Sequence, residues 1–430
     1  MGKDRVCYFY DSELEEVYYG ANHPMKPPRL CMAHHLVLGY ELHRHLEVYV
    51  PRRAVAAELK GFHTEDYINF LSHVTVENQE DLKQQLQHFN MTEDCPVFEG
   101  LWEFCRLYAG ASIQAATRLN HGLSDIAINW SGGLHHAKKA EASGFCYVND
   151  LVLAILELLK YHTRVLYIDI DIHHGDGVEE AFYLTDRVMT VSFHKFGEYF
   201  FPGTGDLVDV GEKAGRYYSV NVPMRRGATD VTFHALFKPI MERIMQVFQP
   251  GCIVLQCGAD SLSGDRLGCF NLSLAGHAEA VRYMKSFGIP LLVTGGGGYT
   301  KQSVAKCWAL ETAVLVGQDK ELADELPDNA YHEYFTPDFR LNASRKRIMD
   351  DENSKAEVER IKVEVLENLR YLEFAPGVQM HQVPPDMYMR EYDAFAQEEG
   401  ADARLLSYAQ AHSILRDPDW PDDEHNPYAL

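Results

Sequence analysis

Residues 165–177 read VLYIDIDIHHGDG, an apolar run in which acidic residues and a histidine then alternate with isoleucine. Side chains on a β-strand point alternately to its two faces, so a strand through this run places Asp169, Asp171 and His173 together and three isoleucines on the opposite face. Burying two unpaired carboxylates costs several kcal/mol unless a cation or dense hydrogen bonding compensates them. We therefore expect a divalent metal at this strand end. The alternative is a strand end that emerges into solvent, where the aspartates cap the next turn.

Apolar runs typical of strands alternate with helix-like segments along most of the chain. The predicted strands cover 6–10, 126–130, 165–170, 188–193, 252–257 and 290–295, and the predicted helices cover 149–162, 230–248, 272–288 and 303–317. This alternation indicates a parallel sheet covered by helices on both faces. We predict a single α/β domain with a catalytic core over 1–325, its C-terminal part over 326–383, and an acidic tail over 384–430 that is partly disordered.

Polar, glycine-rich segments follow five of the predicted strands. They are SGGLHHA (131–137), IHHGDG (172–177), FHKFGEYFFPGTGD (193–206), GADSLSGDR (258–266) and GGGGYT (295–300). Each segment by itself is also compatible with an ordinary loop. Sites in parallel sheets form beyond the carboxyl ends of the strands, so the shared position of all five segments predicts one functional site.

The composition limits the classes of function. The chain has 430 residues, 46% of them hydrophobic, and a formal charge of −23, which argues against general binding to nucleic acid phosphates and favours cationic partners. Its nine cysteines are scattered and never spaced as Cys-x-x-Cys, which predicts reduced thiols in the cytosol or nucleus. No run approaches the ~20 apolar residues of a membrane-spanning helix, and the first residues do not form a signal peptide, so we expect no membrane association.

The candidate metal ligands come from two of the polar loops. A catalytic zinc site commonly has three protein ligands and an open position. Asp171 and His173 supply two of them, and Asp260, in the segment CGADS, is the best candidate for the third. Such a centre polarises a carbonyl and makes a bound water more acidic. Two anionic ligands weaken this effect, so a nearby base is useful.

The paired histidines His135 and His136 are candidates for that base. Asp169 and Asp176 are the carboxylates expected to orient the two rings. Tyr299 follows four glycines, and its hydroxyl is a candidate donor to a developing oxyanion. The alternatives are surface histidines in a loop and a tyrosine that packs its ring in a turn. Phosphate-loop, His-Glu-x-x-His and serine-nucleophile motifs are absent, so metal-assisted hydrolysis is the interpretation that remains.

Five long segments carry a resemblance to a known family. Residues 129–150, 164–183, 187–206, 256–273 and 295–300 resemble the zinc-dependent class I histone deacetylases, and the resemblance extends from Val6 to Val383. Within that class, the doubled phenylalanine Phe200-Phe201 and the segment APGVQMHQVPPDMY (375–388) are most similar to the histone deacetylase 3 group and its plant relatives. The resemblance implies an arginase-like fold, with one parallel eight-stranded sheet and helices on both faces.

The resemblance also implies roles for individual residues. By motif, Asp171, His173 and Asp260 match the zinc ligands, His135 and His136 match the paired histidines with Asp169 and Asp176 as partners, and Tyr299 matches the tyrosine that polarises the acetyl carbonyl. The walls of the acetyl-lysine tunnel match Gly144, Phe145 and Phe201, with Leu267 near the rim and Asp94 as the carboxylate that binds substrate backbone N–H groups. An apolar tunnel accepts the neutral acetylated side chain and rejects charged lysine.

The family typically binds monovalent cations, with K⁺ the expected ion. Asp169, Asp171, His173, Ser192 and Phe193 match an inner cation site, and Phe182, Thr185, Val188 and Tyr218 match an outer one. Several of these residues would contribute backbone oxygens, for which sequence is a weak test.

One surface departs from the family pattern. Lys26 and Arg266 match basic residues that hold an inositol phosphate between class I enzymes and corepressors, but the arginine expected shortly after Tyr299 is Gln302, beside Lys301. Tyr18 and Asn22 replace other residues of the same surface. A neutral amide cannot form arginine's charge-assisted bonds to phosphate, so inositol phosphate binding is doubtful for this chain.

The resulting hypothesis is a nuclear, and also cytoplasmic, zinc-dependent hydrolase that removes acetyl groups from lysines of histone tails and acts with corepressor proteins in transcriptional repression. Two alternatives remain. One is a corepressor scaffold subunit whose activity is weak unless a partner binds, and the other is a polyamine deacetylase, which the class I match across tunnel and rim disfavours.

Overall fold

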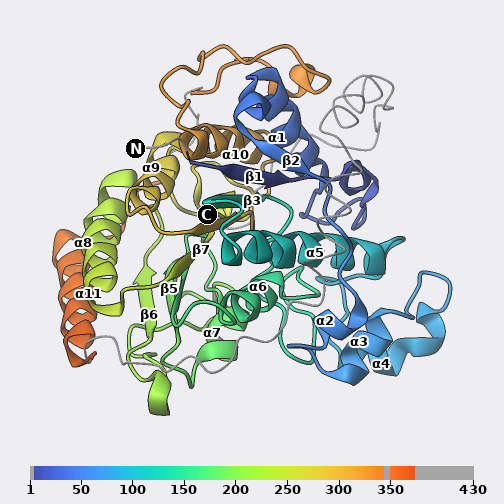
Figure 1. The fold of residues 1–430 in the computed structure, drawn as a ribbon, viewed down its shortest axis with the longest axis horizontal. Helices are drawn as coiled ribbons and strands as arrows, with labels where there is room; N and C mark the ends of the chain where they lie inside the picture. Colours follow the sequence, from blue (N-terminus) through green and yellow to red (C-terminus); the bar gives the residue numbers. More distant parts are fainter. Residues whose placement is uncertain (1–3, 343–348, 373–430) are drawn as a thin grey trace.

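The computed structural model describes residues 4–342 and 349–372. The predicted acidic tail and the segment 375–388 lie outside these described residues. Helices and strands alternate along the described chain around a central sheet (Figure 1).

The sheet has eight strands, and all neighbouring strands are parallel, as predicted. Its order is β2-β1-β3-β8-β7-β4-β5-β6. The strands are β1 (Val6–Phe9), β2 (Glu47–Tyr49), β3 (Ile126–Asn129), β4 (Val165–Asp169), β5 (Val188–Lys195), β6 (Ser219–Met224), β7 (Cys252–Gln256) and β8 (Leu291–Thr294). Because every strand runs in the same direction, all eight carboxyl ends lie along one edge of the sheet.

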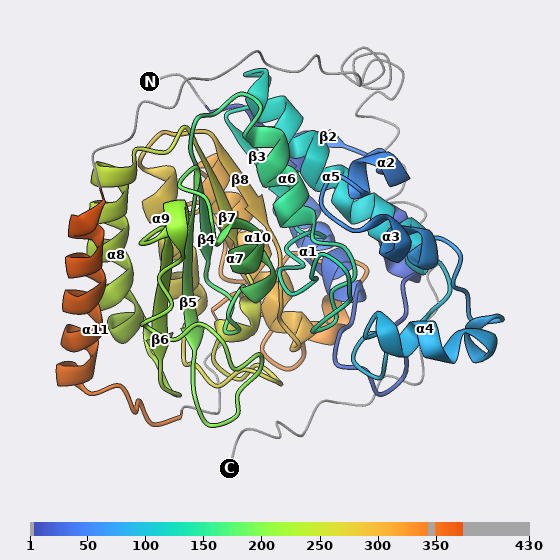
Figure 2. The ribbon, with the colours of Figure 1, turned by 90° about the horizontal axis from the view of Figure 1, so that it is seen from below.

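Side chains of the central strands alternate between two apolar cores, one on each face of the sheet. In β4, for example, Leu166 and Ile168 join the larger core and Val165 and Tyr167 join the smaller one. The helices that cover the larger core are α1 (Pro28–Gly39), α8 (Asp230–Phe248), α9 (Leu274–Lys285) and α10 (Lys301–Val316), and α11 (Lys355–Asn368) packs on the outside of α8 (Figure 2). The smaller core is covered by α5 (Leu101–Asn120), α6 (Asp150–Leu158) and α7 (Asp176–Phe182).

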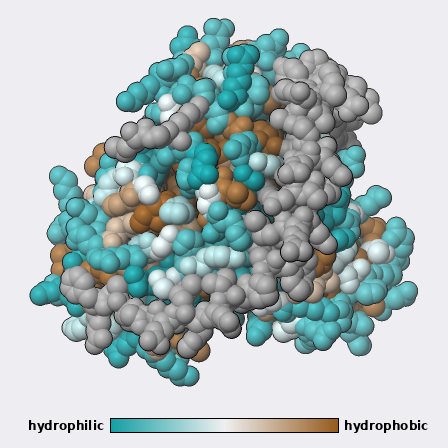
Figure 3. Space-filling view, viewed as in Figure 1, coloured by the Kyte–Doolittle hydropathy of each residue, from teal (hydrophilic) through white to brown (hydrophobic). Residues whose placement is uncertain are grey.

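Three short helices project from this layered body. They are α2 (Ala56–Leu59), α3 (Glu65–Leu71) and α4 (Lys83–His88), and they lie together at the lower right of Figure 1. The face seen in that view is mainly hydrophilic, with an apolar area near its centre (Figure 3). All nine cysteines are buried and none forms a disulfide, and the described residues contain no helix long and apolar enough to cross a bilayer.

The strand prediction was wrong at two places. We predicted neither β2, a three-residue strand at one edge, nor β6 at the other edge, where Asn221 and Pro223 interrupt the apolar run. Proline is tolerated at such an edge because no further strand needs its missing N–H. In addition, β4 ends at Asp169, so Asp171 and His173 lie in the following loop and not on the strand. Ile170 and Ile172 nevertheless stay in the larger core, which keeps the predicted alternation.

Candidate active site

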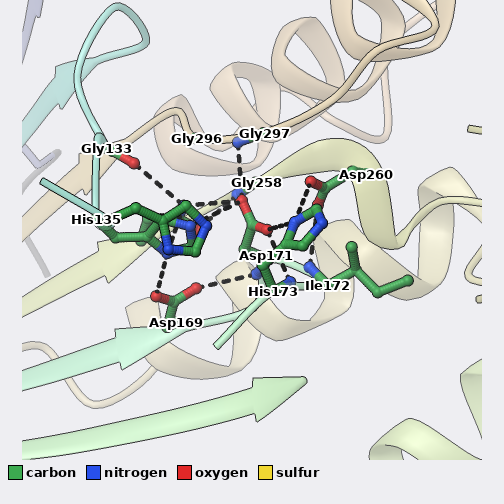
Figure 4. Close-up of polar contacts among 12 residues, drawn as sticks. Gly133, His135, Asp169, Asp171, Ile172, His173, Gly258, Asp260, Gly296 and Gly297 are labelled. Carbon is green, nitrogen blue, oxygen red and sulfur yellow. Dashed lines mark hydrogen bonds and ion pairs between the residues drawn. The ribbon is translucent and has the colours of Figure 1, made fainter. Parts of the chain in front are cut away.

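The loops that follow β3, β4, β7 and β8 converge beyond the carboxyl edge of the sheet. The loops after β4 and β7 bring Asp171, His173 and Asp260 into one buried cluster, in which the potential ligand atoms lie within 4.8 Å of one another. Nδ1 of His173 is 3.0 Å from Oδ1 of Asp171 and 3.1 Å from Oδ2 of Asp260 (Figure 4). Two carboxylates and one imidazole nitrogen therefore point toward the same small space.

The other carboxylate oxygens are held by the protein. Oδ2 of Asp171 accepts a hydrogen bond from Gln256 Nε2 at 3.0 Å. It also accepts one from the Gly297 N–H at 2.8 Å, and Oδ1 of Asp260 accepts one from the Ile172 N–H at 3.0 Å (Figure 4). Each carboxylate thus has one oxygen held by these donors and one that faces His173. The oxygen of Asp171 that faces the His173 ring also accepts the His173 backbone N–H at 2.9 Å. A Cβ atom on Gly297 would lie 2.0 Å from Oδ2 of Asp260, so only glycine fits at this position.

The charges of the cluster fit a divalent cation. Burial and the negative charge of Asp171 raise the pKa of Asp260 above its usual value. Burial disfavours a charged His173 ring, but Asp171 and Asp260 outweigh it and raise its pKa to about 10. Zinc–ligand bonds of about 2.0–2.2 Å at tetrahedral angles separate ligand atoms by about 3.3 Å, close to the spacing seen here. These residues would therefore hold zinc with little rearrangement.

The paired histidines each contact one of the predicted carboxylates. His135 Nδ1 lies 2.7 Å from Oδ2 of Asp169, and His136 Nδ1 lies 2.7 Å from Oδ1 of Asp176. A proton on Nδ1 that is donated to the carboxylate leaves Nε2 of the same ring able to accept a proton. The His135 and His136 ring centroids are 3.9 Å apart, so the two groups act in one small volume.

The two pairs have different surroundings. Asp169 is completely buried and also accepts a hydrogen bond from the Tyr167 hydroxyl at 2.6 Å, whereas Asp176 also contacts Lys138 Nζ at 2.6 Å. Burial opposes the charging of both rings. For His135, the charges of Asp169 and Asp171 overcome it and raise the pKa to about 9, while burial and the neighbouring His135 lower the pKa of His136 to about 3. The surroundings therefore make the two adjacent imidazoles chemically unequal.

Tyr299 borders the same cavity as the paired histidines. The cavity lining also includes Gly144, Tyr19 and, from α1, Arg29. Burial, followed by the charges of Asp260 and Asp171, raises the pKa of Tyr299 well above its usual value. The hydroxyl therefore keeps its proton and is a hydrogen-bond donor at neutral pH.

The predicted tunnel residues surround the histidines and Tyr299. The Phe201 ring meets His136 edge-on at 4.9 Å between centroids, and the Phe145 ring meets Tyr299 edge-on at 5.7 Å. Gly144 has a φ of +51°, and a Cβ there would lie 2.6 Å from the His136 ring and 2.8 Å from the Phe201 ring. A larger side chain at Gly144 would therefore fill the space between these two rings.

The predicted rim residues lie on loops next to these walls. Asp94 is exposed, and its carbonyl oxygen lies 3.2 Å from Nε2 of His23, whose ring packs edge-on against Phe145. Leu267 is half-buried in the loop after Asp260, where its N–H is bound by Asp265.

Three buried polar residues at the site escaped the sequence analysis. Gln256 binds Asp171, Asp265 binds the backbone of Tyr299, and Arg29 donates hydrogen bonds to the carbonyls of Gly296 and Gly298. Gln256 ends a buried strand and Asp265 follows Asp260 within one loop, so their positions in the sequence could have indicated that they lie at the site. Arg29 lies more than 200 residues away in the chain, and nothing in its local sequence indicates the contact.

The residues that match the cation and inositol phosphate sites have other contacts. Ser192 pairs with Asp169 across β4 and β5, and its hydroxyl lies 2.8 Å from His194 Nδ1. Lys26 donates from Nζ to the backbone carbonyls of Gly20 and Ala21. The ammonium group of Lys26 is thus partly engaged by its own loop.

Comparison with known proteins agrees with this geometry. Residues 23–315 match the histone deacetylase domain. The chain is 56% identical to histone deacetylase 9 of Arabidopsis thaliana over 424 residues, which cover 99% of this chain and 98% of that protein. It is 59% identical to human histone deacetylase 1 over 382 residues, 89% of this chain and 78% of that protein, and 58% identical to histone deacetylase 19 of A. thaliana, over 93% of this chain and 78% of that protein. Because the domain match and these alignments span most of its length, this chain belongs to class I of the zinc-dependent histone deacetylase family.

Proposed function

We propose that this chain is a histone deacetylase that hydrolyses the acetyl amide of acetyl-lysine at the site formed by the three-ligand cluster, the two histidine–aspartate pairs and Tyr299. Family membership supports the reaction and the histone substrate. The observation that carries the residue assignment is the convergence of these groups beyond one edge of the sheet, where each has the partner its role requires.

Asp171, His173 and Asp260 would hold the zinc ion, which when bound would polarise the amide carbonyl and make a water more acidic. Hydrogen bonds to one oxygen of Asp171 and one oxygen of Asp260 orient the other carboxylate oxygen of each residue toward the zinc position. Gln256 and Gly297 keep Asp171 in place, and Ile172 does the same for Asp260.

His135 and His136 would move the protons. Asp169 and Asp176 hold Nδ1 of each ring, so Nε2 can take a proton from the attacking water and later deliver one to the departing amine. A histidine of the pair activates the water, and the pair protonates the lysine nitrogen. The Tyr299 hydroxyl donates a hydrogen bond to the acetyl oxygen as negative charge develops there.

The substrate side chain would enter between Phe145 and Phe201, with Gly144 between His136 and Phe201, and Leu267 and Asp94 at the rim. Acetylation removes the lysine charge, so its four-carbon stem can enter an apolar tunnel without the cost of desolvating an ammonium group. Asp94 would accept hydrogen bonds from the peptide backbone outside the tunnel.

Several finer features belong to the same proposal. They are a nuclear location, corepressor partners, a closer relation to the histone deacetylase 3 group, and a K⁺ ion at the site matched by Asp169 and Ser192. Inositol phosphate binding stays doubtful, because Gln302 replaces a charged side chain at that surface.

Turnover of an acetyl-lysine peptide by the purified chain, with and without a corepressor fragment, separates an autonomous enzyme from a scaffold. An acetylated polyamine in the same assay tests the remaining alternative.

Tyr299→Phe tests the proposed chemistry. Removing one oxyanion donor should lower kcat roughly 10²- to 10³-fold, while zinc content stays at one ion per chain. Tyr283→Phe is a matched control, because that hydroxyl donates to the Lys238 carbonyl on α8 and lies outside the site. A Tyr299→Phe protein with wild-type kcat would refute the role given to the hydroxyl.

A further inference from the structure

The backbone of Tyr299 is anchored by a buried carboxylate that belongs to the neighbouring loop. Oδ2 of Asp265 accepts hydrogen bonds from the N–H groups of Tyr299, at 2.7 Å, and Thr300, at 3.1 Å. Asp265 is only 2% exposed. A carboxylate that accepts charge-assisted bonds in a buried site holds its donors more firmly than a neutral acceptor does.

The second oxygen of the same carboxylate holds the rim loop. Oδ1 of Asp265 accepts hydrogen bonds from the N–H groups of Leu267, at 2.9 Å, and Gly268, at 3.1 Å. Thr300 adds a further link, because its hydroxyl donates to the Gly264 carbonyl at 3.0 Å. One side chain therefore ties the loop that carries Tyr299 to the loop that carries the tunnel rim.

The metal-ligand cluster is joined to this arrangement by close packing. A Cβ atom on Gly268 would lie 1.8 Å from the carbonyl oxygen of Asp260, so the backbone of Gly268 rests directly on that of the ligand residue. On the other side of the Tyr299 loop, the Arg29 guanidinium donates to the carbonyls of Gly296 and Gly298. The loop is thus held through its N–H groups by an anion and through its carbonyls by a cation.

We propose that Asp265 is a positioning residue for the deacetylation reaction: its carboxylate fixes the Tyr299 hydroxyl relative to the metal ligands and the substrate tunnel. The inference rests on the function proposed above for Tyr299. An error of about 1 Å in the position of a reacting group can cost roughly a hundredfold in rate, so an anchor at the backbone of Tyr299 has a direct effect on turnover.

Asp265→Asn gives the test, because the amide keeps the shape but turns one of the two acceptor oxygens into a donor. Two of the four backbone N–H groups then face an NH₂ group. We expect kcat on an acetyl-lysine peptide to fall roughly 10- to 100-fold, KM to change less than about twofold, and zinc to stay at one ion per chain. Asp125→Asn is the matched control, because Asp125 also accepts a backbone N–H, from Arg5 at 2.9 Å, but precedes β3 at the opposite edge of the sheet.

A double-mutant cycle with Tyr299→Phe separates positioning from a general structural role. If Asp265 acts through the hydroxyl, Asp265→Asn should cost less than about twofold once that hydroxyl is gone. An equal loss in both backgrounds, a loss confined to KM, loss of zinc, or unchanged kcat would each overturn the inference. Asp171→Asn protein supplies the blank for residual activity. If Tyr299→Phe itself is fully active, the proposed function fails first, so the two failures are distinguishable.

Thr300→Val gives a second variant for the case in which Asp265→Asn does not fold. It removes only the hydroxyl bond to Gly264 and keeps the side-chain shape. We expect a loss of about two- to fivefold in kcat that likewise disappears in the Tyr299→Phe background. The same loss in both backgrounds would contradict the inference.

Discussion

Two buried clusters touch Gly258, in the loop that follows β7, and both are built from residue types that bind metals. The first consists of Asp171, His173 and Asp260, and the second of His277, Cys307 and Glu311. A Cβ atom on Gly258 would lie 1.9 Å from Oδ2 of Asp171. The carbonyl oxygen of Gly258 accepts a hydrogen bond from His277 Nε2 at 2.9 Å. The two clusters are therefore close neighbours in the same low-dielectric interior.

Their geometries differ. In the first cluster, two carboxylate oxygens stand 3.0 and 3.1 Å from one nitrogen, a spacing that a cation can bridge. In the second, Nδ1 of His277 forms a hydrogen bond with Oε1 of Glu311, so the imidazole nitrogen faces a single carboxylate. Nε2 of His277 is already engaged by Gly258.

The two clusters also differ in the number of carboxylates that face the imidazole. The first cluster has two carboxylates for one imidazole, whereas the second has one carboxylate for one imidazole. Burial opposes charging of His277, but Cys307 and Glu311 outweigh it and raise the pKa of the ring well above its usual value. We therefore expect the excess of buried negative charge, and not residue type alone, to make the first cluster the metal site.

The largest effect should follow from breaking the first cluster. Asp171→Asn replaces an anionic ligand by a neutral amide, and we expect zinc to be lost and turnover to fall at least about a thousandfold. Metal analysis and peptide turnover on the same sample measure both. The wild-type chain should contain one zinc and not two, and a second stoichiometric zinc that survives in Asp171→Asn would contradict the contrast drawn between the clusters.

Breaking the second cluster should affect stability instead of metal content. His277→Leu leaves the Glu311 carboxylate buried without its cationic partner, and we expect the free energy of unfolding to fall by about 3–5 kcal/mol while zinc is retained. Denaturant unfolding with metal analysis provides the measurement. The double variant His277→Leu, Glu311→Met should recover most of the loss, because an apolar pair of similar volume can replace a buried ion pair. By contrast, we expect no apolar replacement of the first cluster to restore zinc binding or turnover.

The same contrast explains what could be predicted from sequence. The grouping of the first cluster was predictable because its residues follow apolar strands, where alternating aspartates favour a metal site over the capping of a turn. His277 and Glu311 lie within α9 and α10, where single polar residues are common, so their contact gives no local signal. Asp265 was missed for a related reason. Its partners are backbone N–H groups, and only the folded loops show that Tyr299 and Leu267 share one carboxylate.

The edge strands and the ends of strands show a second limit of prediction from sequence. The central strands were predicted within one or two residues, because both of their faces are buried and their apolar runs are continuous. At the sheet edges, β2 is short and partly exposed, and β6 contains asparagine and proline, so this pattern fails. The end of β4 at Asp169 is set by the pairing of its neighbours, Ser192 in β5 and Gln256 in β7, which are remote in sequence.

His63 extends the comparison to a buried imidazole with no carboxylate partner. Its Nε2 accepts the Asn149 N–H at 3.0 Å and its Nδ1 lies 3.3 Å from the Lys139 carbonyl, so the neutral ring satisfies one donor and one acceptor. Burial lowers the pKa of His63 to about 4. The unfolded chain, with a histidine pKa near 6.5, binds this proton first as pH falls, so folding stability is full above about pH 6.5 and declines toward pH 4.

This decline should amount to at most about 3 kcal/mol, the smallest of the three effects. In His63→Gln, the amide can accept from Asn149 and donate to Lys139 without titrating, so the unfolding free energy should fall less steeply between pH 6.5 and pH 4. Denaturant unfolding at several pH values measures the difference, with His73→Gln, at an exposed position, as the control. If His63→Gln and the wild type lose stability in parallel, the buried neutral imidazole does not contribute to acid sensitivity. In that case, only the buried histidines that face a carboxylate would contribute to the stability of this fold through their charge.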